Sequence, residues 1–462
     1  MKRFFSSPST LEYHQSKLTV AFVHPDLGLG GAERLVVDAA SGLRDRGHRI
    51  AFWTTFFDSS RCFDELKGPE AHPVHVHGNW FPRSIFGRCI ALCAYIRTFL
   101  CTLSLIFHFI LPRYSSQKPH IVFVDQVSIV VPLLRLFKYK VLFYCHFPDK
   151  LLSPGAGKQL SQRTGLSIQN INSKSNSFCS RFVLTPLSHL YRLPLNLAEE
   201  LSTGCANTIV VNSVYTRNVF QAAFRFLARR ELFPEVVYPA VRLCSFFLEN
   251  QGHEMISLGD LEEFDHVVLS INRFERKKNI KLALEAFQSL KNRCTPEFFS
   301  KCALVLAGGY DSRLSENIEV VNELKTMAIE LSLEKQVFFY PSFSRAEQLS
   351  LLRKARDGGC LVYTPANEHF GIVPIEAMAA RVPVIAVNSG GPTESVVHQV
   401  TGFLVENSPD EFASSVYRVL SDQSLGKRLG KYGRDRAVSK FGLDAFSKKL
   451  EEITLTTVLG RV

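Results

Sequence analysis

The sequence predicts an α/β protein with two doubly wound parallel sheets that face each other across a cleft. The chain has 462 residues, which is too long for one ordinary core and suits two or three domains. Short, almost continuously apolar segments alternate with helical stretches, as parallel strands covered on both faces require. This alternation occurs twice, and the irregular, acidic stretch 239–263 separates the two series.

The first series follows a polar extension, residues 1–17, and forms an N-terminal domain that we place at residues 18–245. The segment LTVAFVH predicts a strand over Leu18–His24, and a glycine-rich loop connects it to a helix over Ala32–Arg46. Further strands are predicted at Arg49–Thr54, His120–Asp125, Lys140–His146 and Thr208–Asn212. Helical stretches separate these strands, which is typical of a parallel sheet.

The second series forms a C-terminal domain, residues 264–440, followed by a C-terminal helix in residues 441–462. Its predicted strands are His266–Asn272, Cys302–Ala307, Gln336–Tyr340, Cys360–Tyr363 and Val382–Val387. Its predicted helices are Asn279–Asn292, Glu316–Leu331, Arg345–Ala355 and Gly371–Ala380. In such sheets ligands bind in the cleft at the carboxyl ends of the strands.

Two segments of the N-terminal domain depart from this regularity. Residues 150–180 are rich in Ser, Asn, Gln and Gly and predict a long mobile loop. Residues 90–111 are strongly apolar, but their charge-free part has only about fourteen residues, short of the roughly 20 that span a bilayer. We interpret them as a helix that lies against a membrane, with Arg88, Arg97 and Arg113 near lipid phosphates. A helix buried in the domain and a membrane-spanning helix are the alternatives.

The chain is basic, with a net charge of +11 and an isoelectric point near 9.1. Such an excess suits nucleic acid, an anionic membrane surface or a phosphate-bearing substrate. No zinc-finger, RNP or basic-zipper pattern occurs, so a membrane surface and a diphosphate substrate fit better than nucleic acid. The eleven cysteines form no C-x-x-C pair, which indicates reduced thiols in the cytosol.

The segment after the predicted strand Cys360–Tyr363 carries two carboxylates, Glu368 and Glu376, in the spacing E-x7-E. If a helix begins near Gly371, its N-terminal amides face the loop that carries Glu368 and can attract phosphate. The carboxylates can accept hydrogen bonds from sugar hydroxyls, so the segment predicts a nucleotide-sugar pocket. Two surface glutamates at a solvated helix end are the alternative.

Basic residues follow the first strand of the second series, in the segment SINRFERKKNI. Arg273 and Lys278, in the spacing R-x4-K, can stabilise the negative charge that develops on a diphosphate when its bond to a sugar breaks. A solvated basic turn is the alternative, and it suits Arg276 and Lys277. Because no D-x-D and no ligand-spaced cluster of His, Cys or Asp occurs, we expect these cations to neutralise the diphosphate without a metal ion.

Four glycines and one histidine complete the candidate site. Gly30 and Gly31 lie between the first strand and helix, where bare backbone can approach a ligand, although a simple tight turn is the alternative. Gly308 and Gly309 follow a predicted strand and either bring a loop close to the nucleotide or turn the chain. His146 ends a strand on the cleft side, where it could position a reacting hydroxyl or bind the donor sugar. The alternative is a histidine whose hydrogen bonds are satisfied by the backbone.

The E-x7-E spacing, followed by a strand and Gly-Gly-Pro, resembles the donor-site signature of family-4 retaining glycosyltransferases, and R-x4-K occurs throughout that family. The segments HPDLGLGGAER, FYCHFPD and INRFERKKN are more specific within that family than these two spacings. They resemble the members that add α-1,3- and α-1,6-linked mannose in the dolichol-linked oligosaccharide pathway. The resemblance extends from about Leu18 to the last helix.

This resemblance implies a GT-B fold and a retaining hexosyltransferase that uses GDP-mannose, with no cofactor and no metal. The implied acceptor is a dolichyl-diphosphate-linked oligosaccharide at the cytosolic face of the endoplasmic reticulum membrane, in assembly of the N-glycan precursor. Other dolichol-pathway mannosyltransferases are implied as possible partners. A last pair of helices, from Asp410 to about Leu455, is expected to pack back across both halves. The Ser/Asn-rich loop is longer than the family's usual connection and lies where the acceptor should enter.

The resemblance also assigns roles to the candidate residues. Glu376 would bind the ribose, Glu368 the hydroxyls of the donor sugar, and Arg273 with Lys278 the diphosphate, while His146 would lie beside the donor sugar. The other donor-binding positions implied are Gly30, Gly31, Gly308, Gly309, Phe370 and Gly371. No enzymic nucleophile is expected, because such enzymes are thought to use front-face attack.

Two other functions remain open. One is a GT-B enzyme that acts on nucleotide sugars alone, such as an epimerase, and the other is an inactive subunit that only binds pathway enzymes. The complete set Glu368, Glu376, Arg273 and Lys278 argues against an inactive subunit.

Overall fold

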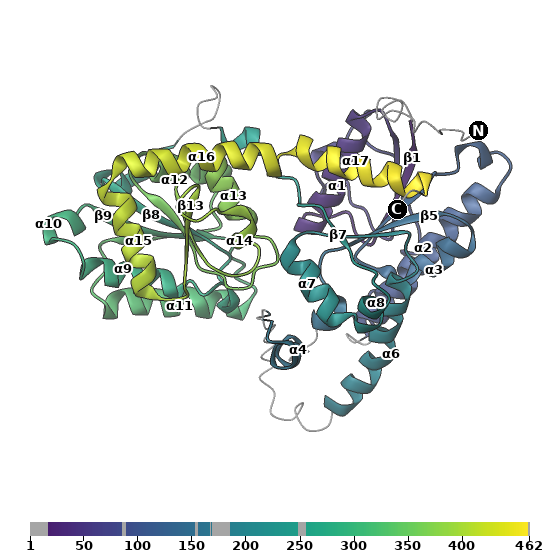
Figure 1. The fold of residues 1–462 in the computed structure, drawn as a ribbon, viewed down its shortest axis with the longest axis horizontal. Helices are drawn as coiled ribbons and strands as arrows, with labels where there is room; N and C mark the ends of the chain where they lie inside the picture. Colours follow the sequence, from purple (N-terminus) through teal and green to yellow (C-terminus); the bar gives the residue numbers. More distant parts are fainter. Residues whose placement is uncertain are drawn as a thin grey trace, which may run out of the picture.

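The computed structural model describes residues 17–85, 89–152, 156–166, 168, 185–247 and 256–460. It contains two parallel sheets, each covered by helices on both faces, and Figure 1 shows the two domains side by side. The predicted fold class, two doubly wound domains, is confirmed.

The N-terminal sheet has the strand order β3-β2-β1-β4-β5-β6-β7, and all of its pairings are parallel. The strands are β1 Thr19–His24, β2 Arg49–Thr54, β3 Val74–Val76, β4 Ile121–Asp125, β5 Lys140–Cys145, β6 Thr208–Val211 and β7 Glu235–Val236. The strand order reverses direction between β1 and β4. Crevices at such points bind ligands, because the connections on either side run to opposite faces.

The helices of this domain are α1 Gly31–Asp45, α2 Ile90–Ile110, α3 Val131–Leu136, α4 Ala156–Thr164, α6 Thr185–Thr203, α7 Val214–Ala223 and α8 Arg225–Arg229. Single turns occur at η2 Asp64–Leu66, η3 Ser115–Gln117, η4 Ser128–Val130, η5 Asp149–Leu152 and η6 Leu243–Phe246.

Helix α4 lies within residues 150–180, so the prediction of one continuous loop there was wrong. The polar side chains did not prevent a helix, because Leu160 is buried in a small cluster with Leu151 and Val219. The rest of that stretch, apart from its first residues and residues 165, 166 and 168, lies outside the described residues.

Helix α2 covers one face of the N-terminal sheet. Its inner side buries Cys101 and Leu105, whereas Phe107 and Ile110 on its outer side are exposed. Arg97 points inward and donates a hydrogen bond of 2.9 Å to the carbonyl of Thr55, so the prediction that it lies near lipid phosphates was wrong. Among the described residues α2 alone is long and apolar enough to cross a membrane, but a core helix of a soluble domain meets the same criterion.

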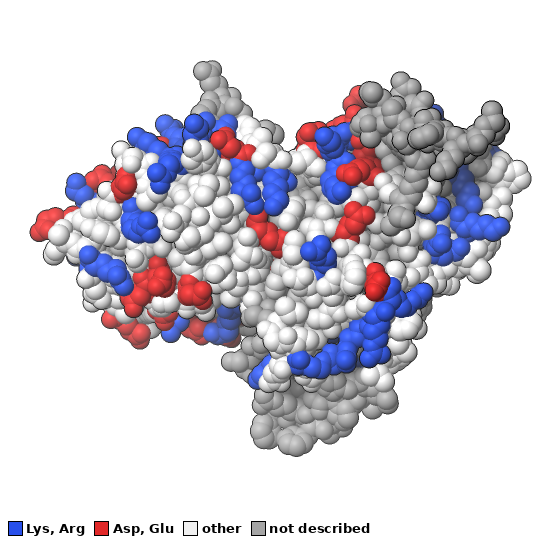
Figure 2. Space-filling model, viewed as in Figure 1, with Lys and Arg blue, Asp and Glu red and all other residues white. Residues whose placement is uncertain are grey.

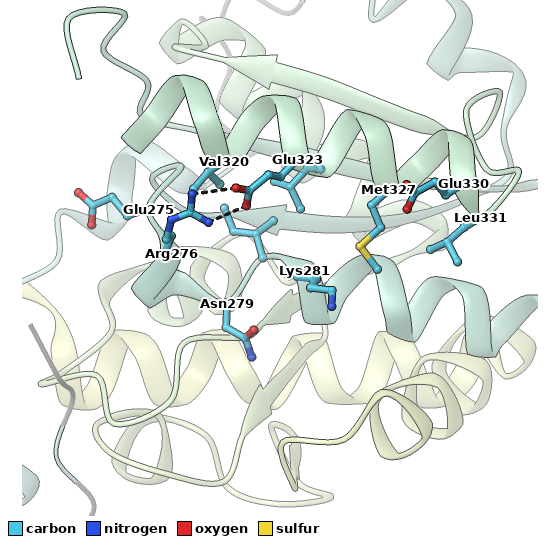
Figure 3. A pocket seen from close by; sticks show the side chains of 11 residues that line it. Glu275, Arg276, Asn279, Lys281, Val320, Glu323, Met327, Glu330 and Leu331 are labelled. Carbon is cyan, nitrogen blue, oxygen red and sulfur yellow. Dashed lines mark hydrogen bonds and ion pairs between the residues drawn. The ribbon is translucent and has the colours of Figure 1, made fainter. Parts of the chain in front are cut away.

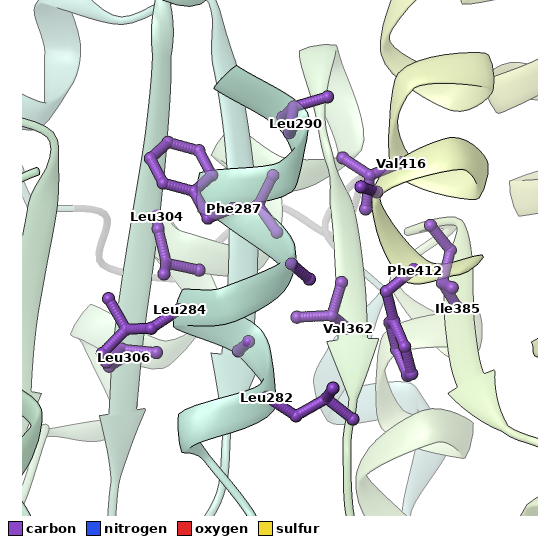
Figure 4. Close-up of a cluster of buried hydrophobic side chains, with 14 of the residues drawn as sticks. Leu282, Leu284, Phe287, Leu290, Leu304, Leu306, Val362, Ile385, Phe412 and Val416 are labelled. Carbon is purple, nitrogen blue, oxygen red and sulfur yellow. The ribbon is translucent and has the colours of Figure 1, made fainter. Parts of the chain in front are cut away.

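The C-terminal sheet has the order β10-β9-β8-β11-β12-β13 and reverses between β8 and β11. Its strands are β8 His266–Ile271, β9 Cys302–Gly308, β10 Val337–Pro341, β11 Cys360–Tyr363, β12 Val384–Val387 and β13 Gly402–Val405. Its helices are α9 Lys281–Lys291, α10 Pro296–Phe299, α11 Ser315–Glu330, α12 Arg345–Gly358, α13 Ile372–Ala379, α14 Pro392–Ser395, α15 Pro409–Ser421 and α16 Gln423–Phe441, with the turns η7 Gly259–Glu263 and η8 Arg276–Lys278. Figure 4 shows how α9 and α15 bury this sheet, with Phe287 and Phe412 packed over Leu304, Val362 and Ile385.

The chain ends by crossing back to the N-terminal domain. Helix α16 stops at Phe441, Gly442 interrupts it, and α17 Leu443–Leu459 then packs on α1 (Figure 1). A Cβ atom on Gly42 of α1 would lie 1.9 Å from Ser447 Oγ, so the glycine permits this close helix contact. His48, which lies between α1 and β2, adds a contact of 3.1 Å with Glu451 of α17. The expected packing across both halves occurs, but with three helices instead of a pair.

Candidate functional site

The carboxyl ends of the two sheets meet through the loops that follow β5 and β11. The ring of Phe147 stacks on the ring of His369, with centroids 3.9 Å apart and planes inclined by 12°. His146 precedes Phe147, and Glu368 precedes His369. This stacked pair therefore brings two of the predicted site residues, one from each domain, into the same part of the cleft.

Glu394, in α14 of the C-terminal domain, caps a helix of the N-terminal domain. Its carboxylate accepts hydrogen bonds of 2.8 Å from the first two backbone amides of α7, those of Val214 and Tyr215. The hydroxyl of Ser213 donates a hydrogen bond of 2.6 Å to the carbonyl of His369. A carboxylate at a helix N-terminus is favourable because it satisfies free amides and opposes the helix dipole. The domains are thus held in contact beside the stacked rings.

The loop between β11 and α13 depends on three glycines. Gly371 forms the N-cap of α13 with φ of 80°, a conformation that favours glycine. A Cβ atom on Gly390 would lie 2.5 Å from the carbonyl oxygen of Glu368, and one on Gly391 would lie 2.2 Å from that of Phe370. The amide of Gly391 donates a hydrogen bond of 2.7 Å to the Glu368 carbonyl. The Gly-Gly-Pro segment thus fixes the backbone that carries Glu368.

Glu376 lies on the second turn of α13, among buried side chains. Burial raises the pKa of its carboxyl to about 7, and the positive charge of Arg345 offsets part of this effect. The carboxyl group of Glu376 therefore titrates much closer to neutral pH than that of an exposed glutamate. Perturbed carboxyl groups in a cleft are candidate ligand contacts.

Lys278 and Glu368 form an ion pair in which Nζ donates to Oε2, and both side chains are mostly buried. Lys278 comes from η8, after β8, and its carbonyl oxygen accepts a hydrogen bond of 2.8 Å from Thr364 Oγ1. Burial and the charge of Glu368 raise the pKa of Tyr363 well above its usual range. The structure therefore brings together one residue of each predicted motif, R-x4-K and E-x7-E.

Arg276 and Lys277, the neighbouring cations of the basic turn, pair with carboxylates other than Glu368. Arg276 forms ion pairs with Glu319 at 2.8 Å and Glu323 at 2.6 Å on α11, and Lys277 lies 2.9 Å from Glu275. Figure 3 shows Arg276 and Glu323 at one end of a cavity of about 530 Å³ between η8, α9 and α11. Neither Lys278 nor Glu368 lines this cavity, so it is separate from the predicted pocket.

Arg273 follows β8, and its side chain is 71% exposed, with Glu275 at 3.5 Å. It passes close to Gly309, where an added Cβ atom would lie 3.3 Å from Arg273 Cγ. At Gly308 an added Cβ atom would lie 1.6 Å from the carbonyl oxygen of Asn272. The glycine pair thus allows the end of β9 to pass directly against the segment that carries Arg273.

His146 belongs to a chain of three buried or half-buried polar groups in the N-terminal domain. Its Nε2 lies 2.7 Å from Asp125 Oδ1, and Asp125 Oδ2 is hydrogen-bonded at 2.8 Å to His24 Nδ1. These residues end or follow β5, β4 and β1, which are adjacent in the sheet, so their carboxyl ends align. His146 is therefore held by a carboxylate rather than by the backbone.

The charges of His24 and Asp125 in this row of polar groups stabilise each other. Burial opposes ionisation of Asp125, but the nearby histidines outweigh it and lower the pKa of Asp125 to about 2. Burial likewise opposes protonation of His24, but its bond to Asp125 and the proximity of Glu33 raise the pKa of His24 to about 9. His24 and Asp125 are both charged at neutral pH.

The first glycine loop lies beside this group. Glu33 Oε1 is 3.8 Å from His24 Nε2, and a Cβ atom on Gly30 would lie 2.1 Å from Glu33 Oε2. A side chain at Gly30 would therefore displace the Glu33 carboxylate from this position. A Cβ atom on Gly31, in contrast, would meet nothing within 4 Å. Packing does not explain Gly31, and its open surroundings leave room for a ligand.

Sequence reasoning missed His24, Asp125, Glu33 and Glu394. The available signal for His24 and Asp125 was their position as the last residues of predicted strands. No motif marked Glu33 or Glu394.

Comparisons with known proteins identify the family. Residues 259–436 match the family model "Glycosyl transferases group 1". The chain is 41% identical to the α-1,3/1,6-mannosyltransferase ALG2 of Rhizomucor pusillus, over 95% of this chain and 91% of that protein. It is also 41% identical to the human protein of the same name, over 94% of this chain and 95% of that protein.

Solved structures support the same architecture. Sucrose-phosphate synthase from Thermosynechococcus elongatus superposes with a TM-score of 0.66 over 96% of this chain and all of that chain, at 19% identity. At this identity the likeness concerns the fold, which is the two-domain GT-B architecture described above. The chain belongs to the ALG2 family of mannosyltransferases and is a hexosyltransferase with a GT-B fold.

Proposed function

We propose that this enzyme transfers mannose from GDP-mannose, with retention at the anomeric carbon, to a dolichyl-diphosphate-linked oligosaccharide. The proposed products carry one α-1,3- and one α-1,6-linked mannose, and the proposed location is the cytosolic face of the endoplasmic reticulum membrane. The names of the relatives support the linkage types. The observation that carries the proposal is the ion pair between Lys278 and Glu368, which joins the two donor-site motifs opposite His146.

The donor is proposed to bind along the C-terminal face of the cleft. Glu376 would accept hydrogen bonds from the ribose, and Glu368 from the hydroxyls of the sugar. Lys278 and Arg273 would contact the diphosphate. The position of Lys278 beside Glu368 supports this division, because a diphosphate joins directly to the sugar that it carries.

We propose that protein cations neutralise the leaving diphosphate and that no metal ion is needed. No group of three or more His, Cys, Asp or Glu side chains suited to a metal occurs in the part of the chain that the structure describes. Lys278 and the exposed guanidinium of Arg273 would supply the positive charge at the end of β8 instead.

The proposed chemical step is a front-face displacement. The bond between the anomeric carbon and the diphosphate oxygen breaks, and its electron pair remains on the diphosphate. The acceptor hydroxyl bonds to the same face of that carbon, and its proton passes to the departing phosphate oxygen. Lys278 stabilises the charge that develops, because a fixed cation needs little reorganisation in a water-poor cleft.

Asp125 is proposed to orient His146 beside the donor sugar. A carboxylate that contacts one ring nitrogen fixes the ring and its protonation pattern. His24, held as a cation, prevents Asp125 from being an isolated buried charge. Asp125 is thus a positioning residue, and His146 is the group placed to touch the substrate.

The proposed function is tested by incubating the purified chain with GDP-mannose and a short-chain lipid diphosphate that carries mannosyl-chitobiose. We expect two mannoses to be added, and the same rate with and without a chelator, because no metal is involved. Mass spectrometry and linkage analysis of the product are the measurements. Sugar conversion without an acceptor, or a strict need for a divalent ion, would contradict the proposal.

Replacing Lys278 by Ala, or Glu368 by Gln, should lower kcat/KM about a hundredfold, since loss of one stabilising group costs on the order of 3 kcal/mol. The double variant should lose much less than the product of the two effects, because the residues act as a pair. Lys277→Ala is the matched control and should retain near-normal kcat/KM, because its side chain contacts Glu275. Equal losses for Lys277→Ala and Lys278→Ala would contradict the assignment.

The pKa of Glu376, raised to about 7 by burial, predicts a pH dependence of donor binding. Above this value the ionised carboxylate accepts hydrogen bonds from hydroxyls, whereas protonation at lower pH weakens them. KM for the donor should therefore rise as the pH falls from 8 to 6, at constant acceptor concentration. Glu376→Gln should have a high KM that does not vary over this range. An identical pH profile for both proteins would refute the role.

Asp125→Asn should reduce kcat about tenfold or more and alter its pH profile, with little change in donor KM. It also removes the partner that raises the pKa of His24 to about 9 from 6.5. In the natural protein this shift stabilises the fold fully below pH 6.5, and the stabilisation is lost as the pH rises through 9. Thermal unfolding at both pH values should show this loss in the natural protein but not in Asp125→Asn. The control is Asp38→Asn, which removes a buried carboxylate of α1 that lies outside this polar group. It should leave the dependence of kcat on pH unchanged.

A further inference from the structure

Helix α6 presents a row of leucines to solvent. Leu193, Leu197 and Leu201 are 70%, 59% and 47% exposed. Their spacing of four residues places them on one face of the helix, and we call them the leucine ridge. Single exposed leucines are common on soluble proteins, but an aligned row indicates an interaction surface.

The two carboxylates of α6 are turned away from this face. Glu199 is buried and accepts hydrogen bonds of 2.7 Å from the Asp149 amide and 3.0 Å from the Lys150 amide. Glu200 accepts a hydrogen bond of 2.6 Å from the amide of Phe226 and lies 3.3 Å from Lys150 Nζ. The acids of the helix thus bind the protein itself, and the leucine ridge faces outward.

Arginines gather beside the ridge, on α4 and α8. Arg163, Arg225, Arg229 and Arg230 are exposed, and we call them the arginine cluster. Three of them line a hollow of about 430 Å³, and Figure 2 shows a band of basic residues over this region. Phe226, which the Glu200 bond ties to α6, is 47% exposed among them. Within the described ranges, the arginine cluster forms no ion pair with a carboxylate.

We propose that the leucine ridge and the arginine cluster dock the N-terminal domain on an anionic phospholipid bilayer. The leucines would enter the boundary between headgroups and acyl chains, and the guanidinium groups would bind lipid phosphates. The two features are complementary to this one partner. Both described acids of α6 are turned away from the apolar row, and the neighbouring arginines have no carboxylate partner among the residues that the structure describes. Helix α2, predicted from the sequence to be the membrane contact, instead has Arg97 turned into the domain.

Hydrogen bonds connect the helix that carries the leucine ridge to the loop that follows His146. Glu199 of α6 holds the backbone of η5, which begins three residues after His146. A lipid-linked acceptor leaving the docked bilayer would therefore reach the cleft beside His146. This consequence rests on the proposed function, whereas bilayer docking itself does not.

The test is flotation of the purified full chain with phosphatidylcholine vesicles, with and without added phosphatidylserine. We expect binding that requires the anionic lipid and weakens with salt. The triple variant L193Q/L197Q/L201Q should bind at least about tenfold more weakly, and so should R225Q/R229Q. Ile318→Gln with Ile329→Gln, on the exposed side of α11, is the matched control and should bind as the natural chain does.

Thermal unfolding and transfer to a short-chain acceptor in solution, both unchanged in the triple variant, would show that it is folded. Vesicle binding by the triple variant equal to that of the natural chain would overturn the inference. The inference would also be overturned if the variant F107Q/I110Q on α2 lost vesicle binding while the triple variant kept it. A dimer formed by the natural chain but not by the triple variant would overturn it as well, because the leucine ridge would then be a dimer contact. A natural chain that binds vesicles but transfers no mannose would instead refute the proposed function alone.

Discussion

The structure depends on the contact between the carboxyl ends of two parallel sheets. In each sheet the strand order reverses once, between β1 and β4 and between β8 and β11, so side chains that follow these strands gather at one point. The stacking of Phe147 on His369 and the capping of α7 by Glu394 then join the two points. Because the polar groups of the site come from both domains, this contact determines whether they form one site or two.

The charges of the site are arranged so that none is isolated before a ligand binds. Lys278 is paired with Glu368, and Asp125 is paired with His24. Removing either partner of a buried pair leaves a charge whose desolvation is not compensated, which is strongly unfavourable. A diphosphate that approaches Lys278 can therefore enter an existing ionic network instead of creating a new buried charge. This pairing explains how the fold accommodates a mostly buried lysine at the position proposed for the anionic donor.

The sequence was sufficient for most strands of the two sheets and for the motifs that lie within one segment. Apolar runs such as Cys360–Tyr363 matched their strands, and E-x7-E placed Glu376 correctly inside α13. Very short strands were missed: β3 and β7 have only three and two residues, and their neighbours in the sheet define them more than their own composition does.

The polar network in the N-terminal domain could not be predicted for a different reason. His24 and Asp125 are 101 residues apart, so only the sheet order shows that they touch. The same holds for Lys278 and Glu368, which are 90 residues apart. Each motif could be recognised alone, but its partner depended on topology. The break of the last helices at Gly442 also depends on packing, since α17 leaves the C-terminal domain to cover α1.

Helix α6 shows how a surface feature can have a cause inside the protein. Burial and the neighbouring Asp149 raise the pKa of Glu199 to about 8, although the amides of Asp149 and Lys150 favour its ionised form. A carboxyl group held there fixes the rotation of α6 about its axis, because the amides that it binds belong to η5. With that rotation fixed, residues at the spacing of the leucine ridge must point away from the domain. The loop after His146 therefore contributes to the orientation of this outer face, together with the hydrogen bonds from Ser128 of η4 to α6.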